Sequence, residues 1–110
     1  TLKHNPRLGE LVGGKPALAL ARIEAHYFIN KMFFDENELL EKLHAISFLP
    51  ARIVQGRYDM VCPVVTAVTL AHSWQNAHIT IVPEAGHSAM EPETRAALVE
   101  ATEAFKLLVN

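Results

Sequence analysis

Two short β-branched stretches with a helical stretch between them constrain the fold of this chain more than any other feature. Residues 51–56 (ARIVQG) and 78–82 (HITIV) have the composition of β-strands, and residues 63–75, which begin with a proline, have the character of a helix. A connection of this length is sufficient for a crossover between parallel strands. The sequence therefore predicts two neighbouring parallel strands and an α/β fold.

Helical patterns flank this strand, helix, strand unit on both sides. Residues 16–30 begin with a proline and are rich in alanine and leucine, residues 35–46 open with acidic residues and space their leucines helically, and residues 91–110 are amphipathic. Residues 1–15 contain three glycines and a proline without a sustained period, which indicates a loop. The expected order is helix, helix, strand, helix, strand, helix.

Two parallel strands are too few for a stable sheet that is covered on both faces. A chain of 110 residues buries only about two thirds of the surface that its unfolded form exposes, so a large exposed apolar face would leave it marginally stable. The chain also begins with Thr1 rather than methionine. We therefore expect the end of a larger α/β sheet, either as a processed product or as a fragment.

The composition favours an ordinary globular domain and excludes several kinds of partner. Half of the residues are apolar and a fifth are charged, and the net charge of −2 comes with scattered lysines and arginines, so neither nucleic acid nor a membrane is an expected partner. There is no apolar run of transmembrane length and no signal peptide pattern. The one cysteine, Cys62, excludes an internal disulfide framework and is interpreted as a small hydrophobic residue, in keeping with a cytoplasmic location.

Two residues that can carry chemistry follow the predicted strands. Asp59 comes three residues after Gly56, and His87 comes five residues after Val82. Because the carboxyl ends of parallel strands share one edge of a sheet, both side chains are expected at the same edge. A carboxylate that accepts the Nδ1 hydrogen of an imidazole fixes its tautomer and stabilises the imidazolium. From the residues alone, a turn-forming aspartate and a helix-capping histidine are as well supported as a catalytic pair.

Three motifs resemble those of a known enzyme family. GRYDMVCP, followed about 28 residues later by AGHSAMEP, is similar to the acid and histidine loops of α/β-hydrolases. The residues of both motifs most resemble those of the proline iminopeptidase (prolyl aminopeptidase) family. Upstream, ARIEAHYFIN resembles a cap-domain helix of that family, and downstream ALVEATEAF resembles its last helix. The resemblance covers residues 16–106 and keeps the order of the motifs.

The resemblance implies a role for each matching residue. Asp59 would be the triad acid, His87 the general base, and Glu24 a cap carboxylate that binds the free α-ammonium group of a peptide or proline-amide substrate. Neither a metal nor an organic cofactor is implied. Aromatic residues of the cap would line an apolar pocket for the proline ring: Tyr27, Phe28 and Phe33.

The same resemblance divides the chain and indicates what it lacks. Residues 1–47 would be the end of a helical cap domain, and residues 48–110 the C-terminal part of an α/β-hydrolase domain, with its last two parallel strands and flanking helices. The Gly-x-Ser-x-Gly elbow that carries the family's nucleophile does not occur in the sequence. By itself the chain is expected to be inactive, and an N-terminal part that supplies the serine would be needed.

Other interpretations remain open at this stage. Ser88 in GHSAM resembles the start of an elbow, but Met90 would crowd the turn, and no histidine follows it. A zinc site from His72, His78 and His87 lacks ligand spacing. The parent enzyme could instead be an esterase or an epoxide-hydrolase-like α/β-hydrolase, and the chain could be a non-catalytic remnant or an interaction domain that pairs through a strand edge.

Overall fold

The computed structural model describes residues 15–107, which form two compact units. Among the described residues, the first unit comprises residues 15–41 and the second comprises residues 42–107. The loop predicted for residues 1–15 lies almost wholly outside the described residues, and so do the last three residues of the helix predicted for 91–110.

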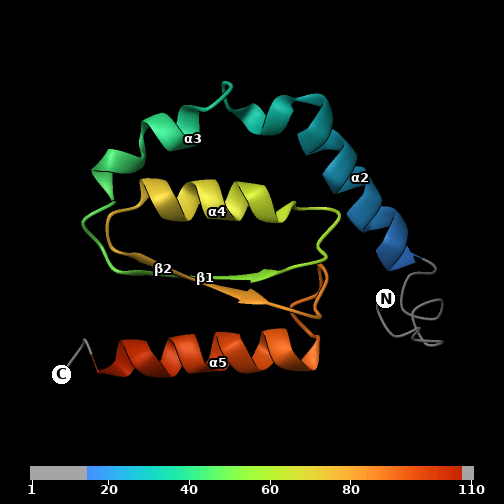
Figure 1. Ribbon diagram of the computed structural model, residues 1–110. Helices are drawn as coiled ribbons and strands as arrows, with labels where there is room; N and C mark the ends of the chain where they lie inside the picture. The colour runs from blue at the N-terminus through green and yellow to red at the C-terminus, as the bar shows by residue number, and fades with distance from the viewer. Residues whose placement is uncertain (1–14, 108–110) are drawn as a thin grey trace. The chain divides into compact units, whose positions relative to one another are not determined.

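The first unit consists of one long helix and two short helical turns (Figure 1). Helix α2 (Lys15–Ile29) matches the predicted helix within one residue at each end, as expected for a segment rich in alanine, leucine and other strong helix formers. It is followed by the 3₁₀ turn η1 (Lys31–Phe33) and by α3 (Glu38–Glu41), which is a single turn.

The prediction of a single helix over residues 35–46 is wrong. The structure has α3 there, followed by the 3₁₀ turn η2 (Leu43–Ala45) of the second unit. Asn37 has a φ of 63°, a left-handed conformation that prevents a helix from starting at Asp35. Of the leucines that suggested the helix, only Leu43 is buried, so packing does not reward a continuous helical face.

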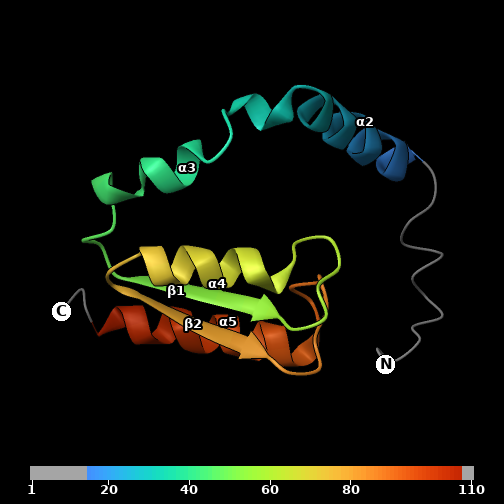
Figure 2. The same ribbon diagram turned by 45° about the horizontal axis from the view of Figure 1, so that its top comes forward.

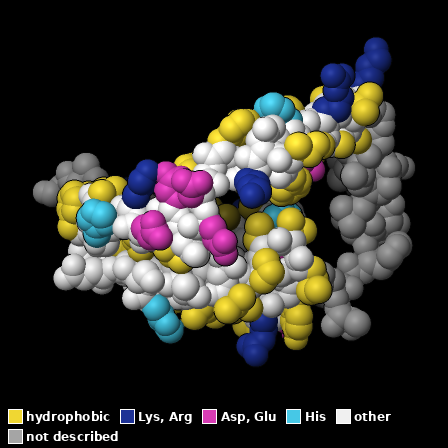
Figure 3. Space-filling model, turned by 90° about the horizontal axis from the view of Figure 1, so that it is seen from above, with side chains coloured by type: hydrophobic (Ala, Val, Ile, Leu, Met, Phe, Trp, Pro, Cys, Tyr) yellow, Lys and Arg dark blue, Asp and Glu magenta, His cyan; other side chains and the backbone are white. Residues whose placement is uncertain are grey.

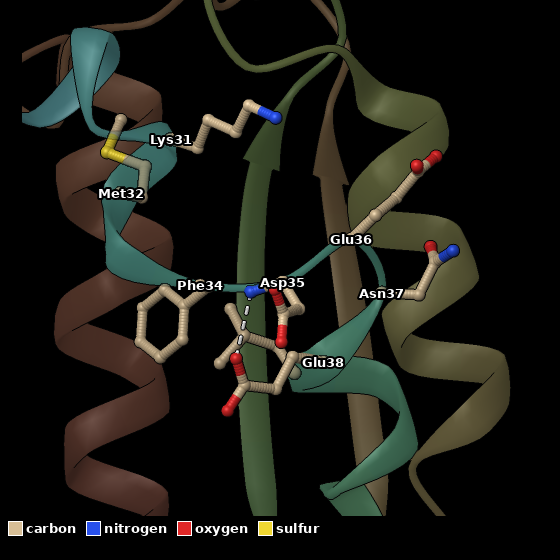
Figure 4. Close-up of a pocket in the computed structure, with 8 residues that line it drawn as sticks. Lys31, Met32, Phe34, Asp35, Glu36, Asn37 and Glu38 are labelled. Atoms are coloured by element: carbon tan, nitrogen blue, oxygen red, sulfur yellow. Dashed lines mark hydrogen bonds between the residues drawn. The ribbon is translucent and has the colours of Figure 1, made fainter.

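The turn after α2 is held in an unusual backbone conformation. Lys31, Met32 and Phe33 have φ values of 50°, 58° and 60°, in the left-handed region that costs non-glycine residues about 1 kcal/mol or more each. Lys31 and Met32 of this turn, together with residues 34–39, line an open hollow of about 480 Å³, and the lining side chains are drawn in Figure 4. There the amide of Asp35 donates a hydrogen bond of 2.9 Å to the Glu38 carboxylate, which closes the loop locally.

The second unit is built around two parallel strands, as predicted. Strand β1 (Ala51–Gly56) pairs with β2 (Ala77–Val82) in a register that runs from Ala51 opposite Ala77 to Gly56 opposite Val82. Because the register is unshifted, both strands end at the same level. The described residues contain no further strand, so each strand is hydrogen-bonded along one edge only.

Two helices cover the two faces of this sheet (Figures 1 and 2). Helix α4 (Val64–Ser73) makes the crossover between the strands, and α5 (Pro92–Lys106) packs on the opposite face. Proline stands immediately before α4 and at the first position of α5, where its missing N–H costs nothing. Among residues 15–107, no helix has the length and apolar character that a bilayer span requires.

The core of the described chain is small for its apolar content. The buried hydrophobic residues are Leu43, Ala67, Val82 and Ala85. Many large hydrophobic side chains of the described residues are exposed instead, and hydrophobic side chains at the surface are coloured yellow in Figure 3. Apolar surface of this extent is typical of an area that another protein segment covers.

Gly56 permits a close approach of the main chain at the end of β1. A Cβ atom at this position would lie 2.0 Å from the carbonyl oxygen of Gly86 and 2.8 Å from that of Ala85, both backbone atoms. No side chain fits there without displacing the loop that follows β2.

We therefore expect Gly56→Ala to destabilise the second unit by about 3 kcal/mol, the upper part of the range for overpacking, because backbone rather than a flexible side chain must shift. Urea unfolding followed by circular dichroism measures this. Thr80→Ala, at an exposed position of β2, is the control and should stay within about 0.5 kcal/mol of wild type. Equal effects of the two substitutions would contradict the prediction.

Candidate active site

The loops that follow the two strands are joined by main-chain hydrogen bonds. The amide of Arg57 donates to the carbonyl of Val82 at 3.0 Å, and the amide of Tyr58 donates to the carbonyl of Ala85 at 2.9 Å. With the contact at Gly56, these bonds place the loop after β1 directly against the loop after β2. We call them the acid loop (residues 57–63) and the base loop (residues 83–91).

Asp59 and His87 meet across these two loops. The Nδ1 atom of His87 lies 3.1 Å from each carboxylate oxygen of Asp59, which assigns the hydrogen to Nδ1 and makes the imidazole the donor. The Asp59 side chain is 7 % exposed, whereas that of His87 is 56 % exposed. In this tautomer Nε2 keeps its lone pair, and among residues 15–107 no hydrogen bond to Nε2 is present.

The Asp59 carboxylate is held in its ionised form by its neighbours. Burial raises its pKa, but hydrogen bonds from the amide of Cys62, the imidazole of His87, the amide of Val61 and the side chain of Gln55 together hold the pKa below its usual value. The two amides donate to Oδ1 at 2.8 and 3.0 Å, which forms a turn stabilised by the aspartate itself. The result is a fixed anion beside the imidazole.

Gln55 on β1 holds the acid loop in place by hydrogen bonds from its side chain. Its Nε2 lies 3.2 Å from Oδ2 of Asp59, 3.2 Å from the carbonyl of Gly56 and 3.0 Å from the carbonyl of Cys62. One side chain therefore connects the end of the strand, the carboxylate and the far side of the loop. Nothing in the sequence pattern indicates this role for Gln55.

Cys62 lies beside the pair rather than in a hydrophobic environment. It is exposed, and ligand atoms of Asp59, Cys62 and His87 all lie within 4.8 Å of one another. A carboxylate, a thiol and an imidazole are metal ligands in principle. However, the Asp59 oxygens already accept hydrogen bonds from two amides, an amide side chain and an imidazole, and a metal ion would have to displace some of these. His72 on α4 and His78 on β2 do not belong to this group.

The position of Ser88 does not suit a nucleophile activated by His87. Its Oγ accepts a hydrogen bond of 3.2 Å from the amide of Met90, and no hydrogen bond to His87 is present among the described residues. The serine lies within the base loop and not on a sharp strand-to-helix turn of the kind that exposes the nucleophile in α/β-hydrolases.

Glu24 lies on α2 in the first unit and is exposed. Phe28 follows it by one helical turn, so the two residues share a face of α2. Tyr27 and Phe33 pack edge to face with ring centroids 5.6 Å apart, and His26 contacts both. Phe28 takes no part in this cluster and is 61 % exposed.

Comparison with known proteins agrees with the α/β fold. Residues 35–107 match the family described as TAP-like protein, a group of α/β-hydrolases. The chain belongs to this α/β-hydrolase family. The matched segment includes both strands, both covering helices and the whole of the acid and base loops.

Several curated proteins that are similar to this hydrolase chain are named proline iminopeptidase. It is 52 % identical over 90 residues to the proline iminopeptidase of Xanthomonas citri, covering 81 % of this chain and 29 % of the relative. It is 48 % identical over 97 residues to that of Arabidopsis thaliana, covering 87 % of this chain and 26 % of the relative. It is 39 % identical over 88 residues to that of Neisseria gonorrhoeae, covering 79 % and 28 %. The chain thus spans less than a third of the length of these relatives.

The lowered pKa of Asp59 gives a pH dependence of stability. Its folded-state pKa lies below the ordinary carboxyl value of about 3.9, so its contribution is complete above that value and is lost as the pH falls through the lowered one. We expect the free energy of unfolding of wild type to exceed that of Asp59→Asn at about pH 5, where the Asp59 carboxylate is ionised. Below about pH 4 the difference should shrink. Urea unfolding at several pH values tests this, and a difference that stays constant to pH 2 would contradict it.

Proposed function

We propose that this chain carries the acid and the general base of a serine aminopeptidase that releases N-terminal proline from peptides. The observation that supports this most directly is the contact between Asp59 and His87 at the shared end of two parallel strands. The relatives named proline iminopeptidase supply the reaction, and the nucleophilic serine would come from protein outside these 110 residues.

In this reaction Nε2 of His87 takes the proton of the serine hydroxyl as it attacks the scissile carbonyl. The same nitrogen then protonates the leaving amine, and the cycle repeats with water to release proline from the acyl-enzyme. Asp59 holds Nδ1–H in place and stabilises the imidazolium that forms in each step. The ionised, hydrogen-bonded state of Asp59 suits this role, because its carboxylate needs no rearrangement when the positive charge appears.

The exposed apolar surface supports a partner that completes the sheet. Each strand has one edge without a hydrogen-bonding partner among the described residues, and the large exposed hydrophobic residues outnumber the buried ones. A segment that adds strands beside this pair would bury such surface and present the serine to His87. A non-catalytic interaction domain would also use this exposed surface. A measurement of activity is therefore needed to distinguish the hydrolase from the interaction domain.

A chimera tests the proposed reaction. Residues 15–107 of this chain replace the matching segment of the Xanthomonas citri relative, and hydrolysis of proline p-nitroanilide is measured. We expect activity in the chimera, no activity in the 110-residue chain alone, and a loss of at least about 10³-fold in kcat for His87→Ala. An inactive but folded chimera would contradict the aminopeptidase assignment, and an active His87→Ala variant would exclude His87 as the base.

We further propose that Glu24 binds the α-ammonium group of the substrate, with the neighbouring Phe28 beside the proline ring. In the chimera, Glu24→Gln should lower kcat/KM for proline p-nitroanilide by about 10²-fold or more, because the substrate cation loses its anion. It should also reduce the preference for the free over the N-acetylated substrate.

Glu36→Gln is the matched control, an exposed glutamate of the same unit, and should leave kcat/KM within about twofold. Unchanged discrimination in Glu24→Gln would favour an esterase-like or epoxide-hydrolase-like parent, which has no need of an amine-binding carboxylate.

A further inference from the structure

We propose that Glu91 is a positioning residue that fixes the base loop and thereby the orientation of His87, an inference that rests on the proposed function. The Glu91 carboxylate accepts hydrogen bonds from the backbone on both sides of His87. The amide of Gly86 lies 3.0 Å from Oε1 and 3.1 Å from Oε2, and the amide of Ser88 lies 3.2 Å from Oε1.

These bonds matter because the histidine has few other constraints. Its side chain is more than half exposed, and its only hydrogen bond among the described residues is the one to Asp59. The direction of the ring therefore depends on the course of the backbone at positions 86–88. In the described part of the chain, Glu91 is the acceptor for the two amides on either side of His87.

Glu91 itself is attached to a rigid element. It is the residue immediately before α5, and its carbonyl accepts a hydrogen bond of 2.9 Å from the amide of Arg95 in the first turn of that helix. Its own amide donates to the carbonyl of Ser88 at 3.1 Å. The carboxylate makes no hydrogen bond to the helix that it precedes and turns back to the loop instead. In this way the base loop is fixed to α5 as well as to the acid loop.

Loss of this carboxylate should therefore act on chemistry more than on substrate binding. A shift of about 1 Å in a catalytic group is enough to cost about 10²-fold in rate, whereas Glu24, to which we assign the substrate amine, lies in the other unit. The expected signature of Glu91→Ala is a lower kcat with little change in KM.

Two measurements test the proposal. In the 110-residue chain, ¹⁵N-edited NMR of the histidine ring follows the Nδ1 proton of His87. In the chimera described above, kcat and KM for proline p-nitroanilide are measured. The variants are Glu91→Ala, Glu91→Gln, which retains an Oε1 acceptor, and Glu93→Ala, which removes an acidic residue from the first turn of α5.

We expect Glu91→Ala to broaden or remove the Nδ1 proton signal and to lower kcat about 10- to 100-fold with KM within about twofold of wild type. Glu91→Gln should recover most of both, and Glu93→Ala should match wild type. If the Ala variant does not fold, the Gln variant still tests the proposal. Because it keeps the Oε1 acceptor, it should keep most of the Nδ1 signal and of kcat, and a full loss of both would contradict the proposal.

A Glu91→Ala variant that keeps the Nδ1 signal and the wild-type kcat would overturn the proposal. So would an equal loss in Glu93→Ala, a Gln variant no better than Ala, or an effect confined to KM. None of these results coincides with failure of the proposed function, which appears as an inactive wild-type chimera or an active His87→Ala chimera.

Discussion

The parallel, unshifted pairing of β1 with β2 is the constraint on which the candidate site depends. It ends both strands at one level, so the residues after Gly56 and Val82 leave the sheet side by side. Main-chain hydrogen bonds and the missing side chain at Gly56 then bring the two loops into contact. A slip of one residue in this register would turn the side chains to opposite faces and separate the carboxylate from the imidazole.

The site can be described as a small set of hydrogen bonds around one ion. Asp59 collects donors from its own loop, from Gln55 below it and from His87 beside it, and these donors outweigh the effect of burial on its pKa. On the other side of His87, Glu91 has a comparable arrangement with backbone amides as donors. Each of the two carboxylates organises the loop that it contacts, and only one of them touches the imidazole.

Much of this arrangement was predictable from local patterns, and the remainder depends on the path of the chain in space. The strands, their parallel order and the crossover helix follow from periodicity, and the structure confirms them. The α/β-hydrolase fold was implied by the resemblance of the motifs to a known family, and the family match confirms it. The prediction of one helix over residues 35–46 was wrong because the leucines that suggested it are mostly exposed, and because Asn37 adopts a left-handed conformation.

The roles of Gln55 and Glu91 had no signal in the sequence. A glutamine on a strand and a glutamate before a helix acquire their hydrogen-bonding partners only when loops fold back on them. The division into residues 1–47 and 48–110 and the roles of Asp59, His87 and Glu24 stay predictions.

The ties between the two loops run through backbone atoms, and this has a consequence for how such a site can diversify. Arg57 and Tyr58 contribute amides, and Val82 and Ala85 contribute carbonyls, so neither of these two hydrogen bonds depends on the identity of a side chain. Substitutions at positions 57 and 58, which are both exposed, would change the shape and charge of the surface beside Asp59 while leaving its spacing from His87 intact. Positions 57 and 58 could therefore be randomised in a library without loss of the contact between the two loops, provided that Gly56 is held constant.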